Sequence, residues 1–309
     1  MIAAFAGPPI ATWSPRPPLP ALPVPSSHDL GNGITLWRLP VGHVRIRERH
    51  RALPPDLAEV DDKLRFPVMM SDRRITGWLD CTAWLIDHPE RCILVDTGES
   101  AGFGTPEYFG AAAKSMGKIY PKIIDATAAP GNDLSAMVAA TGHALSDIGL
   151  CVLTHTHSDH VGHLDALLRT TRLLVSPEEL VPAARSGRLL PKLPQDGRLQ
   201  KTERSVPHDV FGAIMPLTER GDVFVVATPG HTAGHQSVVI ELADRRVVIA
   251  GDAAFEDDQV ARGTIPGIVE QRAATLQTYD MLRRAGRDKP TLALFTHDPT
   301  NEVKLARSP

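Results

Sequence analysis

The segment that most constrains this chain is HTHSDH, at residues 155–160. It follows an apolar run, LCVL at 150–153, which is typical of a buried strand. It precedes Leu164, Leu167 and Leu168, which share one face at helical spacing. The segment is therefore predicted to lie where a strand ends and a helix begins.

The spacing of the ionisable residues in this segment suits metal binding. Side chains at i and i+2 of an extended segment point the same way, so His155 and His157 can converge on one cation. Asp159 and His160 follow the turn and could serve a second cation. Imidazole and carboxylate ligands without thiolate favour Zn²⁺, with Fe²⁺, Mn²⁺ or Co²⁺ as alternatives. The competing interpretation is a helix N-cap at Asp159 with solvated histidines beside it.

Three further segments carry ligand-type residues just after apolar runs. They are His231 within TPGHTAGHQS, Asp252 within GDAAF and His297 within FTHD. Each preceding run is predicted to be a strand. Any one of these residues alone would more often be an ordinary loop residue. Four strands that all end in ligand-type residues instead predict a metal site.

The set HTHSDH, TPGHTAGHQS, GDAAF and FTHD, in this order and with these gaps, resembles the metallo-β-lactamase superfamily over roughly residues 79–297. Within that superfamily, TPGHTAGHQS followed by an aspartate is most similar to the N-acyl-homoserine lactonase group. The resemblance implies an α/β fold, an αββα sandwich of two mixed β-sheets flanked by helices, with the metals at one edge. We expect one catalytic domain at residues 31–309, preceded by a proline-rich arm at residues 1–30.

The resemblance also implies a dinuclear site that holds two divalent metal ions, with Zn²⁺ favoured. Two dications about 3.5 Å apart repel by roughly 19 kcal/mol at an effective dielectric near 20, so an anion is needed between them. One ion would be held by His155, His157 and His231, the other by Asp159, His160 and His297, and Asp252 would bridge the two.

The mechanism expected of such a site is hydrolysis by a hydroxide that both metals share. Asp159 and Asp252 are the predicted catalytic residues, and Asp159 could also pass a proton to the leaving group. Asp96 and His235 are predicted to lie next to the ligands. Asp96 could orient a ligand histidine by accepting its free N–H, although an Asx-turn before Gly98 explains this aspartate equally well.

The activity that the resemblance favours is a lactonase, which opens N-acyl-homoserine lactones or related rings in quorum quenching. Lactonases of the group commonly carry a tyrosine three residues after the bridging aspartate, which hydrogen-bonds the substrate carbonyl. Phe255 occupies that position and cannot donate. Loss of such a donor costs roughly 2.7–4 kcal/mol of transition-state stabilisation unless another group replaces it. The alternative is therefore an aryl-ester or organophosphate-triester hydrolase.

A segment rich in Gly, Ala, Met and aromatic residues, at 102–121, is predicted to cover the site. Local packing is the competing interpretation of this segment. The candidate pocket residues are Tyr108, Phe109, Met116 and Phe255, and Tyr108 could replace the missing donor. The proline-broken segment 176–203 is a second candidate lid. Earlier in the chain, arginines 45, 47, 49 and 51 alternate and are predicted to form a solvated strand face.

The composition limits the partners. A formal net charge of −3 gives no overall basic field for nucleic acid or an anionic membrane. No apolar run approaches the length of a membrane span, and the amino terminus lacks the basic region of a secretory signal. Cys81, Cys92 and Cys151 have no metal-type spacing and are expected to be buried free thiols. We expect a cytoplasmic enzyme that acts on a small molecule with an apolar tail or aryl group, and a homodimer is left open.

Other function classes on this scaffold fit the sequence less well. An iron-dependent redox enzyme usually has altered ligands. A nuclease would need a basic surface and extra domains, which this composition does not supply. A metal-free binding module conflicts with the seven intact ligand positions.

Overall fold

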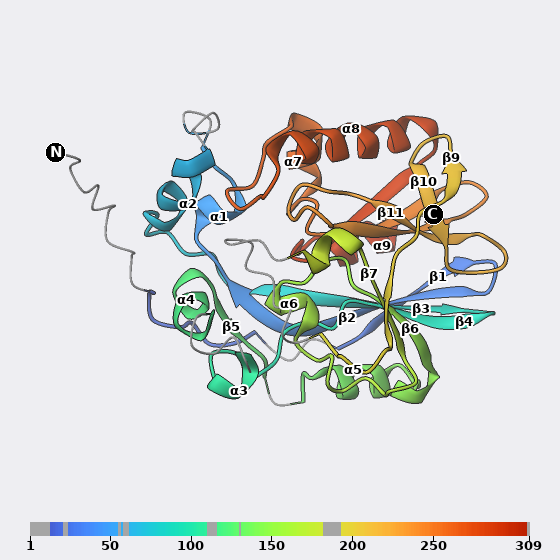
Figure 1. Ribbon diagram of the computed structural model, residues 1–309, viewed down its shortest axis with the longest axis horizontal. Helices are drawn as coiled ribbons and strands as arrows, with labels where there is room; N and C mark the ends of the chain where they lie inside the picture. Colours follow the sequence, from blue (N-terminus) through green and yellow to red (C-terminus); the bar gives the residue numbers. More distant parts are fainter. Residues whose placement is uncertain are drawn as a thin grey trace.

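Two β-sheets pack face to face, and helices cover their outer surfaces (Figure 1). The structure, a computed structural model, describes residues 13–20, 24–54, 57, 62–109, 116–129, 131–181 and 193–307. This arrangement of mixed sheets and flanking helices confirms the predicted αββα sandwich.

The first sheet is built from strands that precede residue 202. Its early strands pair antiparallel, whereas β4, β6, β7 and β8 run parallel to one another. In spatial order the strands are β1 (Ser26–Gly31), β2 (Ile34–Arg45), β3 (Leu79–His88), β4 (Arg91–Val95), β6 (Ile148–Val152), β7 (Arg172–Val175) and β8 (Leu199–Lys201), and β5 (Asp125–Thr127) pairs with β2.

The second sheet is built from the rest of the chain. Its strands pair antiparallel except for the parallel pair β13 and β14. In spatial order they are β14 (Thr291–Phe295), β13 (Arg246–Gly251), β12 (Gln236–Glu241), β11 (Val223–Ala227), β10 (Gly212–Pro216) and β9 (Val206–His208).

The helices lie on the outer faces and at the edges of the sheets (Figure 1). α8 is amphipathic and buries Thr275, Tyr279 and Leu282 on one face. The helical segments are α1 (Glu48–Arg51), α2 (Asp62–Met70), α3 (Pro106–Phe109), α4 (Met116–Ile123), α5 (Leu134–Ala140), α6 (Ser158–Val161), α7 (Asp257–Arg262), α8 (Arg272–Asp288) and α9 (Asn301–Arg307), with the 3₁₀ turns Leu145–Asp147 and Pro177–Leu180.

The main core lies between the two sheets. Alternate residues of one strand face opposite ways, so Val247 and Ile249 of β13 join the layer between the sheets, whereas Val248 and Ala250 pack in the layer that includes Tyr279 of α8. Because both faces of the central strands are covered, their sequences are continuous apolar runs.

The strands that precede the predicted ligands end at one edge of the sandwich. β4 and β6 are parallel, as are β13 and β14. β11 and β13 each pair antiparallel with β12, so they also share a direction. The carboxyl ends of parallel strands meet at the same edge of a sheet, so the loops that follow these strands converge.

The helix predicted after the HTHSDH segment is shorter than expected. α6 ends at Val161, and the chain continues as turns. Gly162 N–H donates to the Gly98 carbonyl at 2.9 Å, and a Cβ on Gly162 would lie only 2.3 Å from that oxygen. The chain is therefore held against the loop after β4, and Leu168 is 42% exposed instead of joining a buried helix face.

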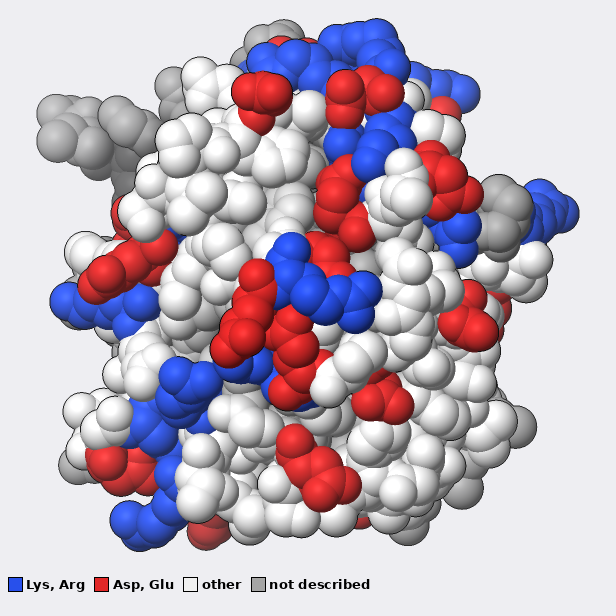
Figure 2. Space-filling view, turned by 90° about the vertical axis from the view of Figure 1, so that its right-hand side faces the viewer, with Lys and Arg blue, Asp and Glu red and all other residues white. Residues whose placement is uncertain are grey.

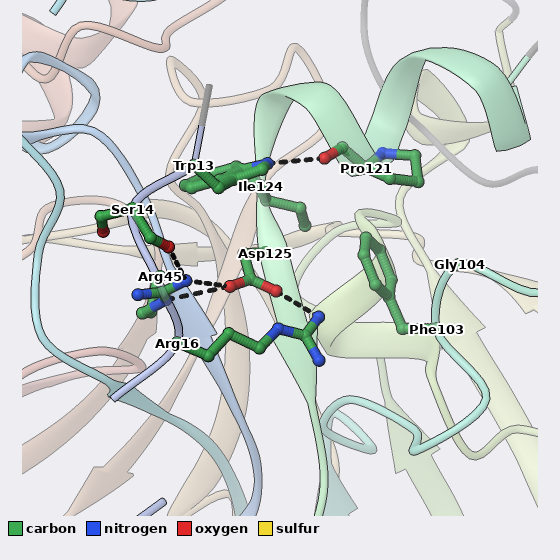
Figure 3. A pocket seen from close by; sticks show the side chains of 9 residues that line it. All are labelled: Trp13, Ser14, Arg16, Arg45, Phe103, Gly104, Pro121, Ile124 and Asp125. Atoms are coloured by element: carbon green, nitrogen blue, oxygen red, sulfur yellow. Dashed lines mark hydrogen bonds and ion pairs between the residues drawn. The ribbon is translucent and has the colours of Figure 1, made fainter. Parts of the chain in front are cut away.

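The prediction that Arg45 and Arg47 lie on a solvated strand face is wrong. They are 1% and 0% exposed. Asp125 accepts hydrogen bonds from Arg45 and Arg16 (Figure 3). The Arg47 guanidinium lies 4.8 Å from the centre of the Trp13 ring. These five residues form what we call the arginine cluster, and the segment 13–20 supplies its outer cover.

All of β1 except Gly31 lies within the residues predicted as an amino-terminal arm, yet the strand pairs with β2 as part of the first sheet. The described part of the arm before it, residues 13–20, contains neither helix nor strand. Trp13 and Trp78 hold it in place, because Trp13 Nε1 donates to the Pro121 carbonyl and Trp78 Nε1 donates to the Pro17 carbonyl.

Lys and Arg side chains are interspersed with Asp and Glu side chains on the face that Figure 2 shows. Cys81, Cys92 and Cys151 are buried and unpaired, as predicted. Over the described part of the chain, no helix has both the length and the apolar character that a bilayer crossing requires.

Candidate metal centre

Three of the predicted ligands meet through their ring nitrogens at the edge where the strands end. His157 Nδ1 lies 3.0 Å from His155 Nε2 and 2.9 Å from His231 Nε2. His155 and His157 follow β6, whereas His231 follows β11 of the other sheet. The two sheets together therefore form this group of three imidazoles.

The other four predicted ligands form a second group. His297 Nε2 lies 3.1 Å from an Asp159 carboxylate oxygen, and His160 Nε2 lies 3.4 Å from Asp252 Oδ1. All four ligand atoms lie within 4.8 Å of one another. The structure thus brings together all seven residues that the sequence singles out.

Asp252 lies between the two groups. Its Oδ2 is 3.5 Å from His231 Nε2 in the first group and 3.6 Å from His297 Nε2 in the second. Its Oδ1 faces His160. This carboxylate can therefore contact both groups at once.

The donor set fits two divalent cations. Nitrogens bound to Zn²⁺ tetrahedrally at 2.0–2.1 Å would stand about 3.3 Å apart, close to the separations in the first group. In the second group, His160 Nε2 and Asp252 Oδ1 are buried and have no hydrogen-bond partner within the described residues. Their 3.4 Å separation is too long for a good hydrogen bond. Buried polar atoms are normally paired, so a cation between them accounts for their arrangement.

The two groups differ in charge. Burial lowers the pKa of His155 and His231 well below the usual value, so these rings are neutral, which metal binding requires. Burial alone would lower the pKa of His297 as well, but Asp252 and Asp159 raise it to about 10. The two carboxylates therefore favour positive charge in the second group, as a bound dication would supply.

Asp96 orients His160. The sequence supported this role and an Asx-turn equally. Its Oδ2 accepts from His160 Nδ1 at 2.8 Å, which directs Nε2 into the second group. Its carboxylate also accepts from the backbone N–H and the hydroxyl of Thr154, both at 2.7 Å. Asp96 has a φ of 62°, a conformation that aspartate tolerates better than most residues.

His235 supports Asp252 from behind. Its Nε2 accepts from the backbone N–H of Asp252 at 3.0 Å, and its Nδ1 lies 3.1 Å from the Thr228 carbonyl and 2.8 Å from the Thr228 hydroxyl. Burial lowers the pKa of His235 to about 3, so the ring is neutral and can accept. His297 is oriented in a similar way, because its Nδ1 donates to the Asp80 carbonyl at 2.8 Å.

Glu179 joins the two ligand loops and was not identified from the sequence. Its side chain is fully buried and accepts from the N–H and hydroxyl of Thr156 and from Gly234 N–H. Glu270 supports the second loop in the same way by accepting from Ala233 N–H at 2.8 Å. Neither glutamate belongs to a motif, so no local pattern indicates that these carboxylates support the ligand loops.

The predicted pocket residues have different positions. Phe255 stacks on His297 with ring centres 5.7 Å apart, so it lies beside the second group. Phe109 is 1% exposed and packs against Tyr108 and Tyr120, which makes it a core residue instead of a pocket wall. The side chain of Met116 lies outside the described part of the structure.

Tyr108 does not present a free hydroxyl as the sequence analysis suggested. Its hydroxyl donates to Glu99 Oε1 at 2.6 Å and also lies 3.2 Å from the Ser158 carbonyl. Burial raises the pKa of Glu99 to about 7. Tyr108 therefore links the aromatic residues Phe103 and Phe109 to Ser158 of the HTHSDH loop.

Residues 76–297 match the family described as the Metallo-beta-lactamase superfamily. The chain belongs to this superfamily. The match begins before β3 and ends at His297, so it spans the loops that carry all seven of the converging residues.

Superfamily relatives include lactonases at low identity. The N-acyl homoserine lactonase AttM of Rhizobium radiobacter is 22% identical over 238 residues, which cover 73% of this chain and 84% of that protein. An N-acyl homoserine lactone hydrolase, solved with N-hexanoyl-L-homoserine at its catalytic metal centre, superposes with a TM-score of 0.63 and 18% identity, covering 87% of this chain and 94% of that one. AidC, a dizinc quorum-quenching lactonase, superposes with a TM-score of 0.61 and 15% identity, covering 91% of this chain and 92% of that one. At these identities the structural likeness shows the fold alone.

Proposed function

We propose that this superfamily member is a dinuclear metal-dependent hydrolase that opens lactone rings. The observation that carries the proposal is the position of Asp252, within 3.6 Å of ring nitrogens in both groups. A carboxylate in that position offsets the repulsion between two dications, which a site for a single ion would not require. The lactonases among the relatives support the choice of substrate.

In this proposal the seven converging residues hold the metals and the rest of the chain orients them. His155, His157 and His231 form one ligand set, and Asp159, His160 and His297 form the other, with Asp252 shared. Two divalent cations, with Zn²⁺ favoured, would supply Lewis acidity and a nucleophile derived from water near neutral pH. No serine or cysteine nucleophile is required.

Asp159 is the residue that we assign to proton transfer. Its side chain is 11% exposed, against 7% for Asp252, so it is the more accessible of the two carboxylates at the centre. The His297 ring, 3.1 Å away, holds the carboxylate in place. A carboxylate so placed can take up the proton that the attacking water gives up and pass it to the leaving alkoxide.

An aryl-ester or phosphotriester hydrolase is the second candidate. The observation that favours it is the Phe255 ring, which lies against His297 and gives the centre an apolar wall without a hydroxyl. Such a wall suits an aromatic leaving group better than a lactone carbonyl.

One panel of substrates separates these candidates. The zinc-loaded chain is assayed with N-acyl homoserine lactones of several chain lengths, p-nitrophenyl acetate and a diethyl aryl phosphotriester, and kcat/KM is compared. We expect lactones to lead and a chelator to abolish all turnover, with metal analysis giving two ions per chain. Full activity in the metal-free protein would contradict the metal centre, and a lead for the phosphotriester would replace the lactonase by the second candidate.

A further inference from the structure

His50 of α1 is a buried polar residue that none of the interactions described above uses. The residue is 4% exposed, and its Nδ1 is buried without a hydrogen-bond partner in the part of the chain that the structure describes. Leaving a buried ring nitrogen unpaired costs free energy, so such an atom commonly marks a place where a ligand or water binds.

Hydrogen bonds hold α1 against the loop that follows Asp252. Gln259 Nε2 donates to the Arg51 carbonyl at 2.8 Å, and Gln259 Oε1 accepts from Phe255 N–H at 2.7 Å. Gly267 N–H donates to the His50 carbonyl at 3.0 Å. His50 is thus fixed next to the segment that carries Phe255, whose ring stacks on a residue of the metal centre.

The charges of the centre that act on His50 are those of His157, Asp159 and His297. These three residues are 7–8% exposed, whereas His155 and His160 are fully buried, so they form the part of the centre that a substrate reaches first. Burial, together with the neighbouring positive charges, lowers the pKa of His50 to about 3. The ring is therefore neutral at neutral pH, keeps one N–H donor and adds no positive charge beside the metals.

The two other candidates for a donor are excluded by the structure. Position 255 is phenylalanine, and the Tyr108 hydroxyl donates to Glu99. The developing negative charge on a carbonyl or phosphoryl oxygen is stabilised when a fixed N–H or O–H donor faces it.

We propose that His50 is a catalytic residue that donates a hydrogen bond to the substrate oxygen at the metal centre, in place of the tyrosine that the resembled lactonases carry. The inference rests on the proposed function, because it assigns the donor that position 255 lacks. With the donor on α1, Phe255 remains an apolar contact beside the centre.

Substitution of this ring tests the proposal. His50→Phe removes the donor and keeps the ring shape, His50→Gln restores an N–H, and His50→Phe with Phe255→Tyr supplies a hydroxyl at the position the lactonases use. His208→Phe in β9, a ring that packs on Phe211 and Phe224, is the matched control. All are assayed zinc-loaded with metal content measured. We expect kcat to fall about 100-fold in His50→Phe, with two ions retained, partial recovery in His50→Gln and in the double variant, and no change in His208→Phe.

A binding measurement gives a readout besides turnover. In zinc-loaded protein, the NMR signal of the His50 imidazole, identified by its absence in His50→Phe, should shift on addition of N-hexanoyl-L-homoserine or of diethyl phosphate. Undiminished kcat in His50→Phe, loss of a metal ion in that variant, or an unshifted His50 signal with both probes would overturn the assignment of His50. Lack of turnover of every substrate by the unaltered chain would instead count against the proposed function, and the NMR shift would still decide the role of His50.

Discussion

The metal centre and the arginine cluster are both buried groups of ionisable side chains, but they are paired in opposite ways. In the arginine cluster, Asp125 accepts from two arginines, and backbone carbonyls take further Arg45 N–H groups (Figure 3). In the metal centre, ring nitrogens face one another, and His160 Nε2 and Asp252 Oδ1 have no hydrogen-bond partner within the described residues. A buried carboxylate that arginines surround supports the fold, whereas a group of buried ring nitrogens that face one another indicates a ligand.

The two clusters also differ in what surrounds them. The segment 13–20 packs on Arg45 of β2 and Asp125 of β5 and places Trp13 against the guanidinium of Arg47, beside a pocket that Arg16 and Asp125 help to line (Figure 3). The metal centre is open enough that Asp159 keeps 11% of its side-chain surface exposed. We therefore expect substitutions in the first cluster to change stability and substitutions in the second to change activity.

The largest effect should come from Asp252→Ala. Loss of the carboxylate shared by both groups should reduce kcat/KM by roughly four orders of magnitude, about 5 kcal/mol of transition-state stabilisation, while the urea midpoint of the metal-free protein changes little. Asp222→Ala is the control, because Asp222 precedes β11 at the opposite end of the sandwich and pairs with His88. Comparable activity losses in Asp252→Ala and Asp222→Ala would show that the loss is not specific to the metal centre.

Asp125→Ala should have the next largest effect, and on stability alone. It leaves Arg45, whose side chain is 2% exposed, buried without its carboxylate, and removing one partner of a buried pair costs about 3–5 kcal/mol. Asp258→Ala breaks the exposed pair with Arg262 and should cost less than about 0.5 kcal/mol. Chemical denaturation measures both, and metal content should be unchanged. Loss of bound zinc from folded Asp125→Ala protein would show that the two clusters are coupled.

The same comparison explains what the sequence could predict. The convergence of the seven candidate ligands was predictable because they follow apolar runs, and strands that share a direction bring their carboxyl ends to one edge. Asp96 and His235 were predictable for the same reason. The fold followed from these motifs through the superfamily resemblance, and the structure confirms it.

The arginine cluster could not be predicted because alternation shows only that residues share a face of a strand. Whether the face is covered depends on segments far away in the chain, here residues 13–20 and β5. His50 was overlooked for a related reason, since it is a single histidine among arginines and outside any motif. The length of α6 depended on a close approach between Gly162 and Gly98, which helical spacing does not reveal.

Asp96→Asn should have the smallest of the three effects, and it tests the boundary between the two kinds of cluster. Asp96 is fully paired, like the arginine cluster, yet the atom it orients is the unpaired His160 Nε2. Asparagine tolerates the positive φ of this position, so the substitution removes charge with little backbone strain.

We expect Asp96→Asn to weaken binding of one zinc ion by roughly 10–100-fold and to leave the other ion unaffected, because only the second group contains His160. Titration against a competing chelator resolves the two affinities. Asp133→Asn, at the N-cap of α5, is the matched control and should bind both ions normally, since asparagine caps helices as well as aspartate does. Equal weakening of both ions would mean that Asp96 supports the centre as a whole, and unchanged affinities would place it with the structural pairs.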